Sequence, residues 1–252
     1  MRIYCACTKK AVASLLALIG AAVLLISAVI AVSAYGIGLP KNETLKGRET
    51  VIIDPGHGEP DGGAVGADGV IEKNINLSIS QKLKNFFLAA GYAVIMTRED
   101  DNAIYDKGSK TIRQKKNTDL HNRLAIINAH PEAIFISIHQ NISTSSKTSG
   151  SLALYSPNNE ESKTLAQLIQ THIVKLLQPE NKKAIAPARK TLYLMNQAKS
   201  PAVIVECGFL SNPSECKLLQ DDVYQNKMAF AIYCGALEFE DSSDSISNHG
   251  TG

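Results

Sequence analysis

The chain contains 252 residues, of which 44% are hydrophobic, and its formal net charge is +2. Once an apolar N-terminal segment is set aside, about 190 residues remain, which is enough for one domain with a sizeable core. The positive charge is weak and scattered and has no aromatic platform beside it, so the sequence argues against nucleic-acid binding.

Residues 1–35 form the clearest break in composition. Ala11–Tyr35 contains no charged residue and follows a short basic stretch. About 20 helical residues cross a hydrocarbon core about 30 Å thick, so this segment predicts a membrane anchor with the following domain outside the cytoplasm. A cleavable signal peptide is the alternative, because residues 32–34 (VSA) resemble a small-residue cleavage site. Both interpretations predict an exported protein, with residues 36–50 as a polar linker.

An apolar strand and a glycine-rich loop begin the exported domain. Residues 51–53 (VII) are followed by Asp54-Pro55, which predicts a strand that runs into a turn. His57 then lies on a loop at the carboxyl end of a strand, where open α/β sheets usually bind ligands. Glu72 follows at the start of a helical pattern, so His57 and Glu72 are two candidate metal ligands.

Helices and strands alternate along the rest of the chain and predict an α/β fold. A polar stretch without periodicity, residues 98–119, is expected either to border the cleft or to be a solvated excursion. The basic loop Pro179–Lys190 is expected to be a solvated surface, with contact to acidic substrate groups as the alternative. Residues 240–252 are expected to be a polar tail. The predicted strands after the first are Tyr92–Thr97, Ala133–Ile138, Ser151–Tyr155, Thr191–Leu194 and Ala202–Val205, and the predicted helices are Glu72–Ala90, one from Thr118 or Asp119 to Asn128, Asn158–Leu177, one starting at residues 211–213 and Asp222–Phe239.

These elements predict a three-layer αβα domain over residues 51–239. Consecutive β-loop-α-β units favour parallel strands with helices on both faces of the sheet. We therefore expect a central, mostly parallel but mixed sheet of about six strands.

A second histidine lies at the end of a later strand. His139 follows the apolar run Ala133–Ile138 in the same way that His57 follows the first strand. Two histidines and one glutamate form the ligand type of open catalytic zinc sites, in which water takes the remaining position. The sequence therefore predicts that His57, Glu72 and His139 bind Zn²⁺.

Glu206 ends the last strongly apolar strand, Ala202–Val205. A carboxylate at the same edge of the sheet as the metal ligands could accept a proton from an activated water, which makes Glu206 the candidate general base. The alternative is a structural carboxylate that pairs with a neighbouring Lys or Arg.

Five blocks of sequence, in order, carry a family resemblance. VIIDPGHG, Glu72 with NINLSISQKL, MTRED, FISIHQN and PAVIVECGFLSN resemble the zinc-dependent N-acetylmuramoyl-L-alanine amidases over nearly the whole exported domain. The resemblance implies hydrolysis of the amide between N-acetylmuramic acid and L-alanine in peptidoglycan. It also implies that His57, Glu72 and His139 bind zinc and that Glu206 is the catalytic glutamate.

Further positions bear on the substrate. Arg98, Arg123 and Asn141 match family blocks and are expected to contact substrate. Gln140 departs from the alanine that the family often has between the histidine and Asn141, and we expect its side chain at the rim of the cleft.

The segments HGEPDGGAVG, IEKNINL and the long loop before DLHNR resemble a subgroup, the sporulation-associated amidases that help to produce muramic-δ-lactam in the spore cortex. This resemblance implies an exported protein on the outer face of the membrane, on the cortex side of the forespore envelope in a spore former. An exported amidase can also need an accessory exported protein partner to assemble its site. Two other functions remain open: a non-catalytic peptidoglycan-binding protein, and a zinc peptidase that acts within the stem peptide.

Overall fold

The computed structural model describes residues 50–66 and 69–247, together with Ser14 and Gly20. Apart from those two residues, the predicted membrane segment and the linker up to residue 49 lie outside the described residues, as do the last five residues of the tail. Within the described part of the chain, no helix is long and apolar enough to cross a membrane.

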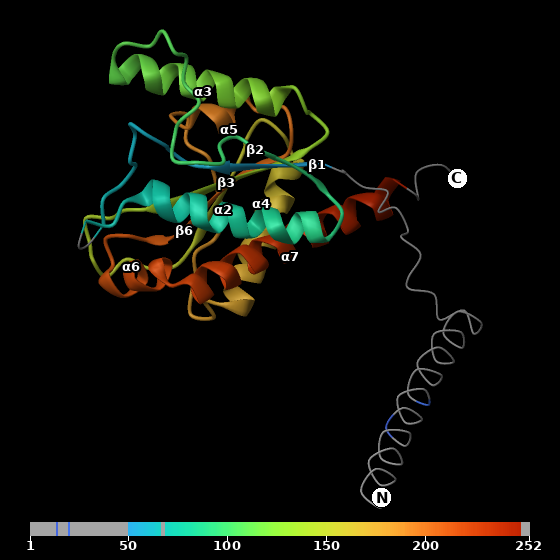
Figure 1. Ribbon diagram of the computed structural model, residues 1–252. Coiled ribbons are helices and arrows are strands. Elements are labelled where there is room, and N and C mark those ends of the chain that lie inside the picture. Colours follow the sequence, from blue (N-terminus) through green and yellow to red (C-terminus); the bar gives the residue numbers. More distant parts are fainter. Residues whose placement is uncertain (1–13, 15–19, 21–49, 67–68, 248–252) are drawn as a thin grey trace, which may run out of the picture. The chain divides into compact units, whose positions relative to one another are not determined.

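The described strands form one mixed sheet in the order β2-β1-β3-β6-β4-β5 (Figure 1). Strands β2, β1, β3 and β6 are mutually parallel, whereas β4 is antiparallel to β6 and parallel to β5. The predicted fold class, with a mostly parallel but mixed sheet, is therefore confirmed. The strands are β1 Thr50–Pro55, β2 Ala93–Met96, β3 Ile134–Asn141, β4 Leu152–Tyr155, β5 Ala186–Pro187 and β6 Ala202–Phe209.

Helices cover both faces of this sheet and complete the three layers. Figure 1 shows α3 and α5 on one face and α2, α4, α6 and α7 on the other. Asn212 caps α6 through hydrogen bonds from the next turn, and Pro213 occupies its first position, as the sequence predicts. The helices are α2 Glu72–Ala89, α3 Ile112–Asn128, α4 Glu161–Leu176, α5 Tyr193–Gln197, α6 Pro213–Gln220 and α7 Asp222–Ser247.

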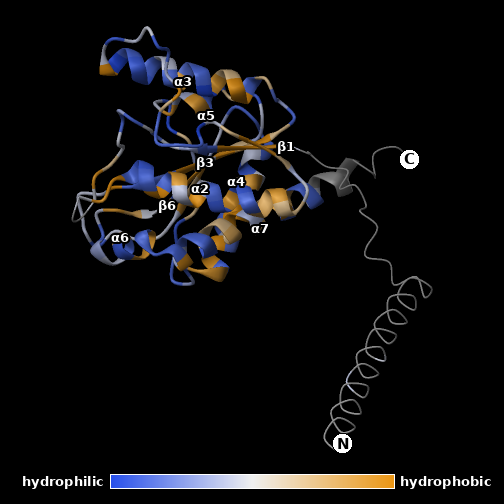
Figure 2. Ribbon diagram, in the orientation of Figure 1, coloured by the Kyte–Doolittle hydropathy of each residue, from blue (hydrophilic) through white to orange (hydrophobic). Residues whose placement is uncertain are grey.

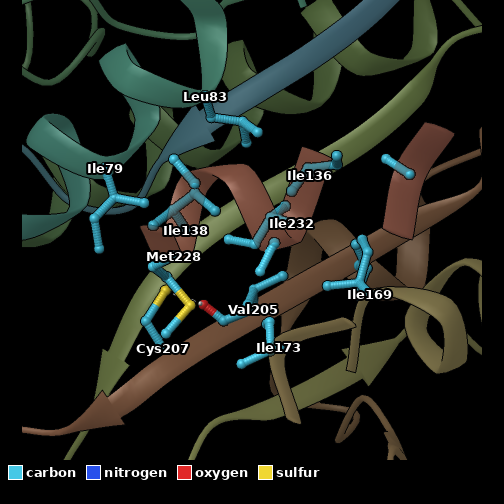
Figure 3. Close-up of a cluster of buried hydrophobic side chains, with 14 of the residues drawn as sticks. Ile79, Leu83, Ile136, Ile138, Ile169, Ile173, Val205, Cys207, Met228 and Ile232 are labelled. Atoms are coloured by element: carbon cyan, nitrogen blue, oxygen red, sulfur yellow. Dashed lines mark hydrogen bonds between the residues drawn. The ribbon is translucent and has the colours of Figure 1, made fainter. Parts of the chain in front are cut away.

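The core lies on both faces because side chains of a strand alternate between them. Ile136 and Ile138 of β3 face the larger cluster with α2, α4 and α7, whereas Phe135 faces the cluster with α3 and α5. In Figure 2 the central strands are largely orange, whereas long stretches of α3 are blue. Each fully buried Ile, Leu or Val side chain contributes about 1.5–3 kcal/mol to folding. Residues from five elements meet in Figure 3: Ile79, Leu83, Ile136, Ile138, Ile169, Ile173, Val205, Cys207, Met228 and Ile232.

Helix α3 begins earlier than predicted. It starts at Ile112, because the Thr111 hydroxyl accepts a hydrogen bond from the Gln114 backbone and the Gln114 side chain accepts one from the Thr111 backbone. The first half of α3 is exposed and polar, so it has no apolar period that the sequence could reveal.

The predicted strand Thr191–Leu194 is wrong. The chain forms the short helix α5 there, and the edge strand β5 lies earlier, at Ala186–Pro187. Helix α5 buries Leu194 and Met195 together with the adjacent Ala198 against the α3 face of the sheet, which a strand with alternating faces would not allow.

Helix α7 continues past the predicted end at Phe239 as far as Ser247. No Gly or Pro interrupts residues 240–247, and Glu240 is buried. The predicted polar tail is thus helical in its first part.

Candidate active site

Three adjacent parallel strands bring the candidate residues to one edge of the sheet. His57 follows β1, His139 lies near the end of β3, and Glu206 lies in β6 directly opposite His139 in the strand register. Parallel strands end at the same edge, so residues more than 60 positions apart in the sequence become neighbours.

His57, Glu72 and His139 offer ligand atoms that all lie within 4.8 Å of one another. The Glu72 carboxylate lies between the imidazoles: Oε2 is 3.2 Å from His57 Nε2, and Oε1 is 3.0 Å from His139 Nδ1. The two rings pack edge to face with centroids 4.9 Å apart. These three side chains could hold a metal ion.

Asp61 and the glycine-rich loop orient His57. The His57 backbone has a φ of 64°, a left-handed conformation that residues other than glycine rarely adopt. Its Nδ1 is 3.0 Å from Asp61 Oδ2, and that oxygen is also 3.0 Å from Lys116 Nζ. Burial disfavours the charged imidazole, but the hydrogen bonds with Asp61 and Glu72 outweigh it and raise the pKa of His57 to about 9.

Glu72 is the first residue of α2 and is buried among hydrogen-bond donors. Its carboxylate accepts from the backbone N–H of Ala64 at 2.7 Å, from that of Gln140 at 3.0 Å and from the Asn76 side chain at 3.2 Å. Burial disfavours the ionised form, but the hydrogen bonds with His139 and His57 outweigh it and hold the pKa of Glu72 well below its usual range. Glu72 is therefore a fixed carboxylate.

Two glycines let the backbone approach these side chains closely. A Cβ on Gly56 would lie 2.2 Å from Cε1 of His139, and a Cβ on Gly63 would lie 2.5 Å from Oε2 of Glu72. Gly63 also has a φ of 72°, which other residues rarely adopt. The tight loop between His57 and Glu72 thus depends on glycine.

Glu206 has a buried Oε2 atom without a hydrogen-bond partner. Burial raises the pKa of Glu206; the histidines at 139 and 57 oppose that effect, and the Glu72 carboxylate adds to it. No Lys or Arg of the described residues forms an ion pair with Glu206, which argues against the structural alternative. A carboxylate with a free oxygen beside possible metal ligands can accept and return a proton.

Arg98 and Arg123 lie beneath the loop. Both are almost completely buried. Arg98 donates to the carbonyl oxygens of Gly56 and Lys73, and Arg123 donates to the His57 carbonyl and pairs with Asp54. These guanidinium groups hold the loop that carries His57, so the geometry does not favour the expected contact with substrate.

The expectation that Gln140 reaches the cleft rim is wrong. Alternation along β3 directs Gln140 to the face opposite His139, where it is 4% exposed and donates to Asn76 Oδ1 at 3.2 Å. Asn141 follows a register shift, is half-buried, and accepts a hydrogen bond from the Ile142 backbone. Asn141 therefore remains a candidate for substrate binding.

Sequence reasoning did not identify the groups that support the ligands. Asp61 and Lys116 act on His57, and Asn76 acts on Glu72. For two of these residues the sequence spacing is informative. Asp61 follows His57 by four residues, and Asn76 lies one helical turn after Glu72. Lys116 had no such signal, since it comes from a distant helix.

A cavity of about 420 Å³ opens beside the two histidines on the face of the sheet that carries α3 and α5. Its wall includes Tyr105 and Lys115, which belong to the stretch 98–119. The expectation that this stretch borders a cleft is therefore confirmed for residues in both of its halves.

The profile of a family described as N-acetylmuramoyl-L-alanine amidase matches residues 51–238. The germination-specific N-acetylmuramoyl-L-alanine amidase of Bacillus subtilis is 38% identical over 189 residues, which cover 75% of this chain and 78% of the relative.

Solved structures are similar over the same domain. The CwlD amidase from Clostridioides difficile, in complex with the GerS lipoprotein, matches with a TM-score of 0.74 and 40% identity, covering 77% of this chain and 98% of that chain. An N-acetylmuramoyl-L-alanine amidase from Clostridium difficile 630 matches with a TM-score of 0.66 and 30% identity, covering 77% and 97%.

Proposed function

This chain belongs to the N-acetylmuramoyl-L-alanine amidase family and hydrolyses the amide between N-acetylmuramic acid and L-alanine in peptidoglycan, and we propose that it does so with Zn²⁺ held by His57, Glu72 and His139. The observation that carries this proposal is the convergence of the three ligand groups within 4.8 Å beside a buried, unpartnered oxygen of Glu206. Two imidazoles and one carboxylate suit zinc and leave a coordination position open.

The chain's own residues have distinct roles in the proposed reaction. Zinc would supply a Lewis acid that polarises the lactyl carbonyl and activates water. Glu206 accepts a proton from the attacking water and delivers it to the alanine nitrogen as the C–N bond breaks. The products are a free muramic carboxyl group and a peptide with a new N-terminal alanine, so atoms and protons balance. Asp61 and Asn76 hold His57 and Glu72 in position.

The setting of the reaction is part of the same proposal. Because the Bacillus subtilis relative is a germination-specific amidase, we infer that this chain acts on spore-cortex peptidoglycan and contributes to muramic-δ-lactam formation. Its substrate lies outside the cytoplasmic membrane, which agrees with the apolar segment Ala11–Tyr35 as an anchor or signal peptide. The Clostridioides difficile enzyme was solved in complex with a lipoprotein, so we infer an exported accessory protein here as well.

A digestion experiment tests the reaction. The zinc-loaded full chain, kept in mild detergent because of its apolar residues 11–35, is incubated with peptidoglycan and with its accessory protein if one is identified. Mass spectrometry should detect intact stem peptides with a new N-terminal alanine. His57→Ala should abolish their release, whereas His130→Ala, a surface histidine outside the site, should not.

Each other outcome identifies a different function. Cuts between amino acids of the stem would support the zinc peptidase. Binding to peptidoglycan without any cut, by a chain shown to hold zinc, would support the non-catalytic binding protein. The unpartnered oxygen of Glu206 argues against that second function, because binding alone needs no general base.

A further inference from the structure

The cavity of about 420 Å³ continues the metal site along one face of the sheet. His57 and His139 form part of its wall, together with Ser137 and Ile204, which alternation places on the same face. Its volume lies in the range of small-molecule sites, about 300–1,000 Å³. A group bound there would touch two of the proposed zinc ligands, so the cavity can hold one side of the scissile amide.

The surface of the cavity suits a peptide better than a sugar. Much of its wall is aliphatic and comes from Leu120, Leu192, Leu194, Met195 and Ile204. A sugar ring carries hydroxyl groups that lose hydrogen bonds to water against such a wall, whereas the methyl and methylene groups of a short peptide gain from contact with it.

The two tyrosines of the wall are already in ring contacts. Lys115 Nζ lies 4.6 Å from the centroid of the Tyr105 ring, and the Tyr193 ring packs edge to face against His121 with centroids 5.5 Å apart. One face of the Tyr105 ring is therefore occupied by the Lys115 ammonium, and both residues belong to the wall of the cavity.

Of the Lys and Arg side chains in the cavity wall, Lys115 is the one available to pair with a carboxylate of a bound ligand. Lys116 is paired with Asp61 at 3.0 Å, and Arg123 is paired with Asp54 and Asp119. Lys115 has no carboxylate partner within the described ranges 50–66 and 69–247.

We propose that this cavity binds the peptide on the leaving side of the amide and that Lys115 selects a peptide with a free carboxylate. The inference rests on the proposed function, because only that reaction places a peptide on one side of the bond. The aliphatic wall takes the alanine methyl group and the chain that follows it. The Lys115 ammonium pairs with the α-carboxylate of the next residue through a charge-assisted hydrogen bond.

Binding of two dipeptides tests the proposal without relying on catalysis. Both dipeptides have the γ-carboxyl group blocked as a methylamide: L-alanyl-D-glutamate, the acid, keeps a free α-carboxylate, and L-alanyl-D-isoglutamine, the amide, has none. They are titrated into the zinc-loaded full chain by calorimetry. Loss of a hydrogen bond to a charged group changes affinity by about tenfold or more, so the wild type should bind the acid about tenfold more tightly than the amide. Lys115→Gln should remove this preference while leaving the affinity for the amide unchanged. Lys175→Gln, an exposed lysine on α4, is the matched control and should keep the preference.

A kinetic measurement adds a second readout. With muramyl dipeptides that carry D-glutamate or D-isoglutamine, both blocked as the γ-methylamide, Lys115→Gln should raise KM for the acid alone, with kcat unchanged. The proposal is overturned if the wild type binds neither dipeptide, if it shows no preference, or if Lys115→Gln weakens both equally. If the wild type binds the acid selectively but releases no peptide from peptidoglycan, the proposed function fails and the proposed binding site stands.

Discussion

His139 on β3 and Glu206 on β6 are directly opposite each other in the register of two parallel strands. Neighbouring strands lie about 4.8 Å apart, and opposed residues point to the same face, so the sheet itself fixes this proposed zinc ligand beside the proposed general base. The other two ligands come from a loop and a helix start that fold onto this pair. Metal binding and proton transfer should therefore be separable by mutation.

Removal of zinc should abolish peptide release, and its return should restore it. The three donor groups are held in position by hydrogen bonds, so the site should bind zinc again without refolding. Activity is measured after chelation, dialysis and addition of one equivalent of zinc. Glu72→Gln should not recover, because a neutral amide is a poor zinc ligand. Full activity in thoroughly metal-free protein would contradict a metal-dependent reaction.

Gly56→Ala should lower zinc affinity and activity severely. The added Cβ would lie 2.2 Å from the His139 ring, so the ring must move. Gly108→Ala is the matched control, because nothing lies within 4 Å of its Cβ. Zinc affinity is measured by competition with a chelating dye. Equal affinity of the two variants would show that His139 tolerates displacement.

Asp61→Asn should weaken zinc binding by about 10- to 100-fold, the usual effect of losing a group that orients a metal-bound histidine. The Asp61 carboxylate forms a hydrogen bond with His57 Nδ1 at 3.0 Å, and this bond directs the other ring nitrogen, Nε2, towards Glu72. The same dye competition measures the effect, and Asp222→Asn, an exposed carboxylate on α7, is its control. An unchanged zinc affinity would mean that the loop alone orients His57.

Asp54 should make the domain sensitive to acid. Burial would raise its pKa, but the Arg123 guanidinium and the hydroxyl groups of Ser137 and Thr97 lower the pKa of Asp54 from 3.8 to about 2. A depressed folded-state pKa contributes stability above the unfolded value, and this contribution is lost as the pH falls from 3.8 towards 2. The lost free energy of unfolding is about 2 kcal/mol.

The measurement is urea unfolding of wild type and Asp54→Asn between pH 5 and pH 2. The variant should be less stable at pH 5, because Arg123 loses its buried partner. The stability difference should shrink by about 2 kcal/mol as the pH falls to 2. A difference that stays constant would contradict the assigned ion pair.

Much of the fold could be predicted because the buried strands are short apolar runs. Ala133–Ile138 and Ala202–Val205 stand out for this reason, and the chemically active residues follow them directly. The comparisons confirm the family and the activity that the sequence blocks indicated. Polar segments gave no such signal: α3 starts with a hydrogen-bonded cap on an exposed helix, and α5 depends on contacts with a distant face of the sheet.

The parts of the site that the sequence did not reveal depend on tertiary contacts. Lys116 forms an ion pair with Asp61 from another element, the helix α3. Arg98 and Arg123 donate their hydrogen bonds to backbone carbonyl groups that take up these positions only in the folded loop. Gln140 is different, because its direction followed from alternation along β3 once His139 was assigned to the other face. Strand periodicity alone therefore predicts a side chain on the α2 face at position 140.

The most direct measurement compares zinc content and peptide release in Glu206→Gln. If Glu206 is the general base and His57, Glu72 and His139 are the ligands, the variant should bind one zinc ion per chain with wild-type affinity. Its release of peptides with N-terminal alanine should fall by about 10²- to 10⁴-fold, the usual contribution of general acid–base catalysis. Wild-type turnover by this variant, or loss of its zinc, would contradict the assigned roles.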